Sequence, residues 1–144
     1  MLIDRALALD ADYSDGAIHG FLISYELSRQ GAAGDPNARA RQHFERVVEL
    51  THGQLASPYV ALAEGVSVSR QDRREFESLL RQALAVDPNA RPEWRLANLI
   101  LQRRARWLLS RTDQLFLDPG ASSSGRTAVP VPLATAVLSF ARQP

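Results

Sequence analysis

The chain has 144 residues, of which 45% are hydrophobic and 23% charged, so it is long enough for one domain with a buried core. Its formal net charge is +1, which gives no electrostatic reason to expect a nucleic acid or an anionic membrane as partner. The chain has no cysteine, which excludes disulfides, thiolate zinc sites and cysteine nucleophiles.

The first residues and the overall hydropathy bear on membrane targeting. No run approaches the roughly 18–20 apolar residues of a membrane span. The start, Met1 to Arg5, lacks the basic and apolar regions of a signal peptide. It resembles the last turns of a helix, so we expect the chain to be the C-terminal part of something longer.

Three short segments that resemble one another indicate an internal repeat. They begin at Ala6, Val47 and Ala83, and each is followed by a turn. Their spacing is close to the period of about 34 residues that is typical of tetratricopeptide (TPR) helix pairs. We interpret each segment as the end of the second helix of a pair.

Apolar spacing and start signals place the first two complete helices. In the first of them, one apolar stripe is expected to face its neighbours, and the helix is expected to end near the glycines at 31–34. Asp35-Pro36 is a start signal for the second helix, because Asp can cap free amides and Pro at the first position loses no hydrogen bond. The first stripe consists of Ile18, Phe21, Leu22 and Tyr25, and the second of Ala40, Phe44, Val47 and Val48.

Three further helices are predicted. Ser57-Pro58 repeats the start chemistry, and the run that begins at Asp72 resembles a capping box. Asp87-Pro88 ends the fourth helix, and Pro92 opens a fifth that runs to about residue 110. The apolar sides predicted for these helices hold Tyr59, Leu62, Ala63 and Val66; Phe76, Leu79, Leu80, Ala83 and Leu84; and Trp94, Ala97, Leu101, Ala105 and Leu108.

The predicted fold is all-α. No strand is expected before residue 118, and TPR-like antiparallel helix-pair repeats would stack into an α-solenoid. We assign residues 1–118 to this helical-repeat domain and residues 119–144, rich in Pro, Gly and Ser at their start, to a low-complexity tail. The alternative for the tail is a short terminal helix that docks on the last repeat.

The sequence has no pattern typical of catalysis. It lacks a Gly-x-Ser-x-Gly elbow and a phosphate-binding Gly-x-x-x-x-Gly-Lys loop. His19, His43 and His52 lack the spacing of metal ligands, and we expect them at the surface or in a groove. The arginines at 103, 104 and 106 beside Trp107 are interpreted as a solvated helix face. We therefore expect no enzyme, cofactor, metal site or nucleic-acid partner.

Five residues are candidates for binding, because the first helix of each pair in a solenoid lines the concave surface. His19 and Glu26 are seven residues apart on one helix and share a face, with aromatic residues on the adjacent one. The five candidates, chosen from helix position and side-chain type, are His19, Tyr25, Glu26, Tyr59 and Asn98.

Three stretches of the chain resemble one protein family. They are SDGAIHGFLISYELSR at 14–29, GQLASPYVALAEGVSV at 53–68, and RLANLILQRRARWLLSR at 95–111 followed by Leu115-Phe116-Leu117. Together with Asp35-Pro36 they resemble the T-component of tripartite ATP-independent periplasmic (TRAP) transporters, the TatT-type lipoproteins, over about residues 1–118. Generic TPR proteins lack the strings around GAIHGFLISYE and LASPYVALAE.

The resemblance implies a non-catalytic accessory subunit of a periplasmic solute uptake system. It also implies a lipid anchor on a cysteine near the N-terminus of the precursor, a homo-oligomer, and binding of the periplasmic solute-binding protein (P-component) and of an apolar small ligand. The family's N-terminal half lies outside this chain, and the tail from Pro119 onward does not resemble the family. The alternative function is a generic TPR scaffold for protein–protein interaction.

Overall fold

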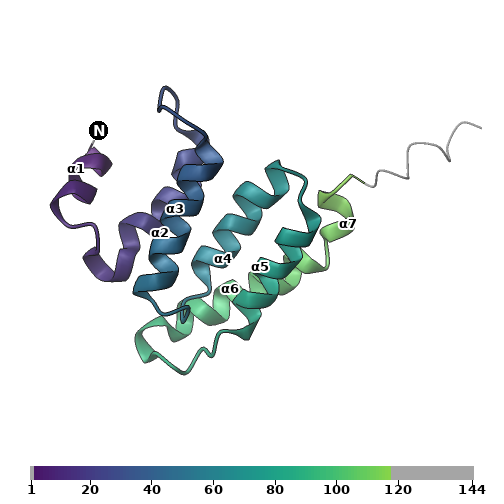
Figure 1. The fold of residues 1–144 in the computed structure, drawn as a ribbon. Coiled ribbons are helices and arrows are strands. Elements are labelled where there is room, and N and C mark those ends of the chain that lie inside the picture. The colour runs from purple at the N-terminus through teal and green to yellow at the C-terminus, as the bar shows by residue number, and fades with distance from the viewer. Residues whose placement is uncertain (1, 118–144) are drawn as a thin grey trace, which may run out of the picture.

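The fold of this protein is all-α, as predicted. The computed structural model describes residues 2–117, and within them it contains helices and no strand (Figure 1). Stacking of the helices in the TPR manner stays a prediction, and the predicted tail at 119–144 lies outside the described residues. In chain order the elements are α1 (Leu2–Leu9), α2 (Tyr13–Ser28), α3 (Pro36–Leu50), α4 (Ser57–Leu62), the π-helical turn η1 (Ala63–Ser67), α5 (Arg73–Ala85), the 3-10 turn η2 (Pro92–Trp94), α6 (Arg95–Leu109) and α7 (Thr112–Leu115).

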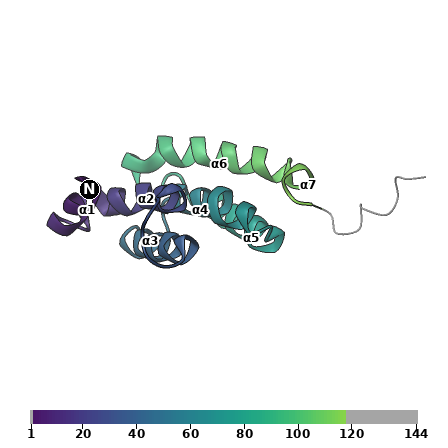
Figure 2. The same cartoon turned by 90° about the horizontal axis from the view of Figure 1, so that it is seen from above.

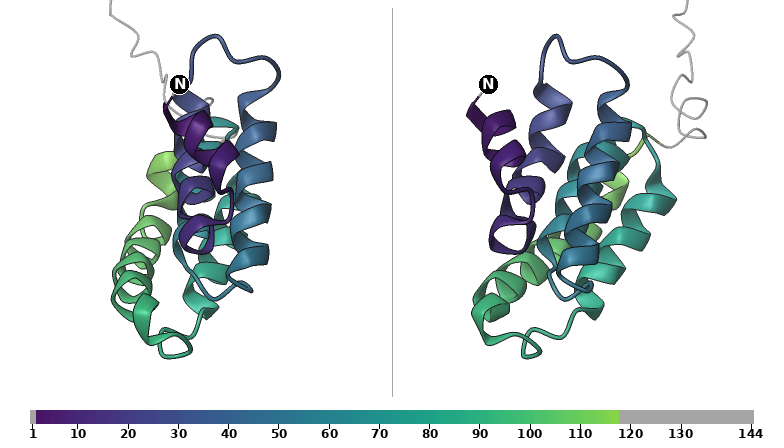
Figure 3. Two further views of the ribbon diagram at one scale, coloured as in Figure 1. Left: turned by 90° about the vertical axis from the view of Figure 1, so that its left-hand side faces the viewer. Right: turned by 60° about the vertical axis from the view of Figure 1, so that its left-hand side comes forward.

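The helices form layers. α2 and α3 run antiparallel and side by side, and α4 with η1 packs against α5 in the same way (Figures 1 and 3). Helix α6 contacts α4 and α5 and runs along one side of the molecule, opposite α3 (Figure 2). One face of α6 is therefore directed into the protein and the other away from it.

Local chemistry explains two of the predicted helix starts. The Asp35 carboxylate accepts a hydrogen bond from the backbone N–H of Asn37 at 3.0 Å, so α3 begins as predicted. Asp72 caps α5 in the same way, accepting from the N–H of Glu75 at 2.9 Å. The expectation for Ser57 was wrong, because the residue at the cap position of α4 is Ala56 and no side chain caps this helix.

The hydrophobic core lies between α2, α4, α5 and the inner face of α6. Phe76, which is fully buried, packs edge-on against Phe116 with ring centroids 5.0 Å apart, so the segment after α7 closes one end of this core. The core residues predicted for α5 are confirmed, with Leu84 at its edge. Other aliphatic side chains that are almost fully buried are Leu22, Ile23, Val47, Val60, Leu62, Val66 and Leu80.

The predicted stripe on α2 was wrong in part. Phe21 is 56% exposed, whereas His19 and Glu26 face inward beside Leu22. The polar residues can be buried because α3 supplies partners for both of them. On the fifth predicted helix, Ala97 is likewise exposed rather than buried. Amide side chains take the inward positions there.

Candidate functional site

His19 lies between α2 and α3 and pairs with a second histidine. It is 9% exposed, and its Nδ1 is 2.7 Å from Nδ1 of His43 on α3. Burial lowers the pKa of both imidazoles below the ordinary value of 6.5, and the charge of Arg46 lowers that of His19 further. The expectation of a surface or groove histidine was therefore wrong for His19.

Glu26 is the centre of an ion-pair network that joins three helices. Its side chain is 2% exposed and bonds Arg39 of α3 and, at 2.9 Å, Arg29. Arg29 reaches Asp4 of α1 at 3.0 Å. Burial acts to raise the pKa of Glu26, but the hydrogen bonds from the two arginines outweigh it and lower this pKa. The carboxylate thus holds α1, α2 and α3 together.

The two candidate tyrosines lie in different environments. Tyr59 is 8% exposed and packs edge-on against Phe44 with ring centroids 5.4 Å apart, and burial raises its pKa. Tyr25 is half-buried and stacks on Phe21 at 5.4 Å. With Leu2, Ile3 and Ala6 of α1, this aromatic pair lines an apolar groove of about 350 Å³.

Asn98 fastens α6 to the loop that precedes α4. Its Oδ1 accepts from the N–H of Ala56 at 2.8 Å, and its Nδ2 donates to the carbonyl of Gln54 at 2.9 Å. One turn further along α6, Gln102 donates to carbonyls at the end of α5, the shortest bond being 2.7 Å to Val86. Sequence reasoning missed Gln102, because a polar residue among apolar neighbours gives no sign of a partner 16 residues earlier.

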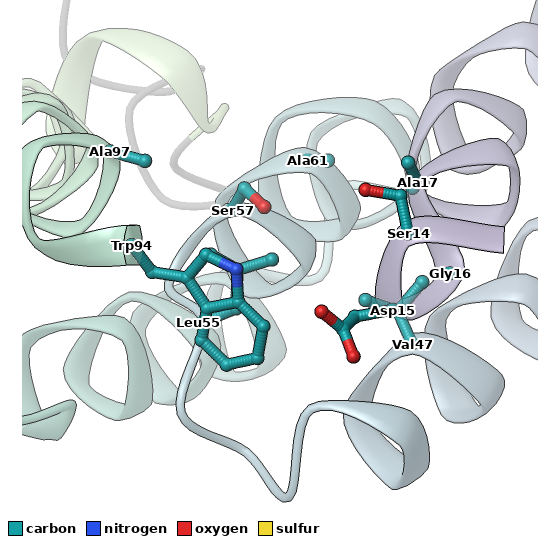
Figure 4. Close-up of a pocket in the computed structure, with 11 residues that line it drawn as sticks. Ser14, Asp15, Gly16, Ala17, Val47, Leu55, Ser57, Ala61, Trp94 and Ala97 are labelled. Carbon is teal, nitrogen blue, oxygen red and sulfur yellow. The ribbon is translucent and has the colours of Figure 1, made fainter. Parts of the chain in front are cut away.

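A cavity of about 420 Å³ opens between the starts of α2, α4 and α6 (Figure 4). The hydroxyls of Ser14 and Ser57 point toward one another, and the carboxylate of Asp15 points toward the ring of Trp94. Within residues 2–117, the side chains of Ser14, Asp15 and Ser57 form no hydrogen bond or ion pair. The other lining residues carry no polar side chain; they are Gly16, Ala17, Gly20, Val47, Leu55, Ala61 and Ala97.

A strained backbone segment forms one wall of this cavity. Ser14, Asp15 and Gly16 have φ values of 52°, 54° and 83°, in the left-handed region that non-glycine residues rarely adopt. A Cβ on Gly16 would lie 2.9 Å from Cδ1 of Leu50, the end of a flexible side chain that can move, so the backbone conformation is the main reason for glycine here. Strain of this kind is typical of segments held in place by their surroundings, often at ligand sites.

The arrangement is suited to binding. Ligand pockets of this size are mostly apolar and carry a few polar groups that orient the ligand, and the cavity beside Trp94 has this composition. No cluster of three or more His, Asp or Glu side chains able to hold a metal ion occurs in residues 2–117. No helix in the same range is long and apolar enough to cross a membrane.

Comparison with known proteins gives the family. The model of the TRAP transporter T-component family matches residues 1–116. The chain belongs to the TRAP transporter T-component family. The match thus covers every helix described above.

A relative in Treponema pallidum (strain Nichols), described as an uncharacterized protein, is 27% identical over 118 residues. The match covers 82% of this chain and 36% of the relative, so the T-component chain spans about a third of the length of that protein.

Proposed function

We propose that this T-component chain acts by binding: it associates with the periplasmic solute-binding protein of its TRAP system and holds a largely apolar small ligand. The observation that carries the proposal is the family match over residues 1–116. The open cavity and the apolar groove support it, because concave and mostly apolar surfaces of this kind are typical of ligand sites.

The ligand would occupy the cavity beside Trp94. A volume of about 420 Å³ is sufficient for a small organic molecule. The ring of Trp94 and the side chains of Leu55 and Val47 would contact its apolar part, and the hydroxyls of Ser14 and Ser57 would orient a polar end. The groove that contains Tyr25 offers a second apolar surface.

The other candidate residues would act on binding indirectly. His19, Glu26 and Tyr59 hold α2 and α3 in place, and Asn98 holds the loop beside Leu55 on the cavity wall. We propose them as positioning residues that set the shape of the binding surfaces. Of the five candidates predicted from the sequence, only Tyr25 would contact an apolar ligand directly, in the groove that it lines.

The remaining parts of the proposal concern location and assembly. A T-component that works with a periplasmic solute-binding protein would itself be periplasmic, anchored through a lipid on the precursor. Large apolar side chains are exposed at Leu2 (87%) and Leu9 (77%) on α1, and contiguous exposed apolar surface favours self-association. We therefore propose a homo-oligomer that covers this helix. A monomer in size-exclusion chromatography, together with a sharp cooperative transition in thermal denaturation, would contradict the proposed homo-oligomer.

The test is binding of the whole protein that carries this chain to the solute-binding protein encoded beside it. We expect a saturable complex by isothermal titration calorimetry. Trp107→Phe leaves Trp94 as the sole tryptophan of these 144 residues, so the difference in fluorescence between this background and a Trp94→Phe, Trp107→Phe variant reports on the cavity. We expect an apolar ligand to change the fluorescence of Trp94, and Ser57→Leu, which fills the cavity, to suppress that change. A purified whole protein with no affinity for the solute-binding protein would refute the proposal.

A further inference from the structure

We propose that the outer face of α6 is a docking surface for a protein partner that presents carboxylates around an apolar patch. The face is defined by Leu96, Leu99, Ile100, Arg103 and Trp107. The inference rests on the proposed function, because the partner to be tested is the solute-binding protein, and it adds the surface and the chemistry by which that partner is recognised.

The outer face of α6 exposes several large apolar side chains. Leu96 is 71% exposed, Leu99 45%, Ile100 56% and Trp107 46%. Residues at these spacings lie on one side of a helix, so the four side chains form a continuous stripe. The opposite side of α6 already serves the core through Ala105 and Leu108. A helix that is apolar on both sides is typical of one with a second partner.

Hydrogen bonds from its inner side fasten α6 to the rest of the protein. Asn98 and Gln102, on the inner side of α6, bond backbone groups of the loop before α4 and of the end of α5. These amides anchor the helix at two successive turns. A partner would therefore meet a preformed surface and pay little ordering cost, which favours affinity.

The positive charge of α6 also favours a partner with carboxylates. The 15 residues of α6 include four exposed arginines and no acidic residue. Among the described residues only Arg104 of these four forms an ion pair, with Glu64 at 3.1 Å from its Nε; Arg95, Arg103 and Arg106 have none. Uncompensated positive charge along an apolar stripe is complementary to carboxylates around an apolar patch.

Trp107, at one end of the face, is flanked by two arginine side chains. The guanidinium groups of Arg104 and Arg111 lie 4.6 and 5.1 Å from the ring centre of Trp107. Tryptophan and arginine are the residues that most often dominate the energy of protein interfaces. We therefore expect Trp107 and Arg103 to contribute most of the binding energy of the contact.

The apolar stripe and the arginines of α6 favour an acidic protein as the partner over a second copy of this chain or a membrane surface. A second copy of α6 would place arginines opposite arginines, and like charges facing one another are unfavourable. A membrane surface is matched by basic groups that flank an apolar face, whereas Arg103 lies between Ile100 and Trp107 in the middle of the stripe. A protein surface can place a carboxylate at that point.

The experiment uses the whole protein and the solute-binding protein, with affinity measured by calorimetry. We expect Arg103→Glu and Trp107→Ala each to weaken binding by about tenfold or more. The matched controls are Arg74→Glu on α5 and Tyr13→Ala at the start of α2, both on exposed residues away from α6, and we expect no change from them. Added salt should weaken the wild-type complex, and Arg103→Glu should reduce this dependence.

The outcomes separate the surface from the function. If the wild-type protein binds and both α6 variants bind equally well, the docking surface is refuted and the proposed function stands. If the wild-type protein does not bind, both are refuted. Binding of phosphatidylglycerol vesicles that requires Arg103, without binding of the protein, would assign the face to a membrane. Self-association lost in Trp107→Ala would assign it to a second copy. Either result overturns the proposal.

Discussion

His19 and His43 join α2 to α3 through their ring nitrogens, with Nδ1 of one 2.7 Å from Nδ1 of the other. At this distance one nitrogen must carry a proton and the other must accept it, so the pair is stable only while at least one ring is neutral. Burial lowers the pKa of both rings. The packing of α2 against α3 therefore responds to pH through these two imidazoles.

Acidification is expected to destabilise the protein through this pair. Because the folded pKa values lie below the ordinary 6.5, the unfolded chain takes up more protons, and stability falls as the pH drops below about 6.5. The nearby charges are mixed: Arg46, Arg29 and Arg39 oppose protonation, and Asp12 and Glu26 favour it.

Urea denaturation at pH 7.5 and 5.5 measures this effect. We expect the free energy of unfolding to fall by about 1–2 kcal/mol between these pH values, since each histidine contributes at most about 1.4 kcal/mol per unit. His43→Gln should remove much of this dependence. His52→Asn is the control, because His52 is exposed at φ 52°, a conformation that Asn accepts. An unchanged pH dependence in His43→Gln would contradict the assignment.

Glu26 should be the most costly carboxylate to remove. Glu26→Gln leaves Arg39 and Arg29 without their shared carboxylate in a site where the glutamate is 2% exposed. Breaking one side of a buried ion pair costs about 3–5 kcal/mol, and the partly exposed arginines reduce this to about 2–3 kcal/mol. Thermal and urea unfolding provide the measurement.

The control for Glu26→Gln is a variant of an exposed ion-pair network on the surface of α5. Glu77 bonds Arg73 at 3.0 Å and Arg81 at 2.7 Å, and both arginines are well exposed. Exposed pairs of this kind contribute about 0–1 kcal/mol. Equal losses in Glu26→Gln and Glu77→Gln would show that burial does not strengthen the Glu26 network.

Local signals predict the helix starts at Asp35 and Asp72 correctly, and long-range partners account for the errors elsewhere. Asp35 and Asp72 cap the residues that follow them within three positions, so their roles are visible in the sequence. Ser57 does not cap α4, and the neighbouring Ala56 N–H is bonded by Asn98, 42 residues away. No local pattern could indicate that pairing.

In the candidate site too, local features could be predicted from the sequence and long-range partners could not. Asn98 and Glu26 were selected from helix position, but their partners come from other elements, and a single sequence does not reveal whether a polar side chain faces solvent or a partner. A turn after the first repeat segment is predicted, but the left-handed conformation of Ser14 and Asp15 within it is not, because both residues ordinarily have negative φ. The cavity wall that it forms could therefore be seen only in the folded chain.

Asn98 should be required for the position of the loop before α4. Asn98→Ala removes two hydrogen bonds from a site with no solvent exposure and leaves the Ala56 N–H and the Gln54 carbonyl without their partner. We expect a loss of about 2–3 kcal/mol in the free energy of unfolding, because each orphaned buried group costs about 1–3 kcal/mol. Faster amide hydrogen exchange at Ala56 would localise the effect.

Asn89→Ala is the control for that experiment. Asn89 is exposed, and within residues 2–117 its side chain makes no hydrogen bond, so we expect a change within about 0.5 kcal/mol. A loss in Asn98→Ala no larger than this would mean that water replaces the amide without cost.

Two glycines of α2 are expected to respond to alanine in opposite directions. Gly16 has φ +83°, and a Cβ there would lie 2.9 Å from Cδ1 of Leu50. Gly20 is in the regular part of the helix, where a Cβ would meet nothing within 4 Å. We expect Gly16→Ala to destabilise the fold by about 1–3 kcal/mol and Gly20→Ala to stabilise it by about 0.5–1 kcal/mol. Both residues line the cavity, so Trp94 fluorescence separates a change of cavity shape from a change of stability. Destabilisation by Gly20→Ala, or tolerance of Gly16→Ala, would contradict the left-handed turn that forms the cavity wall.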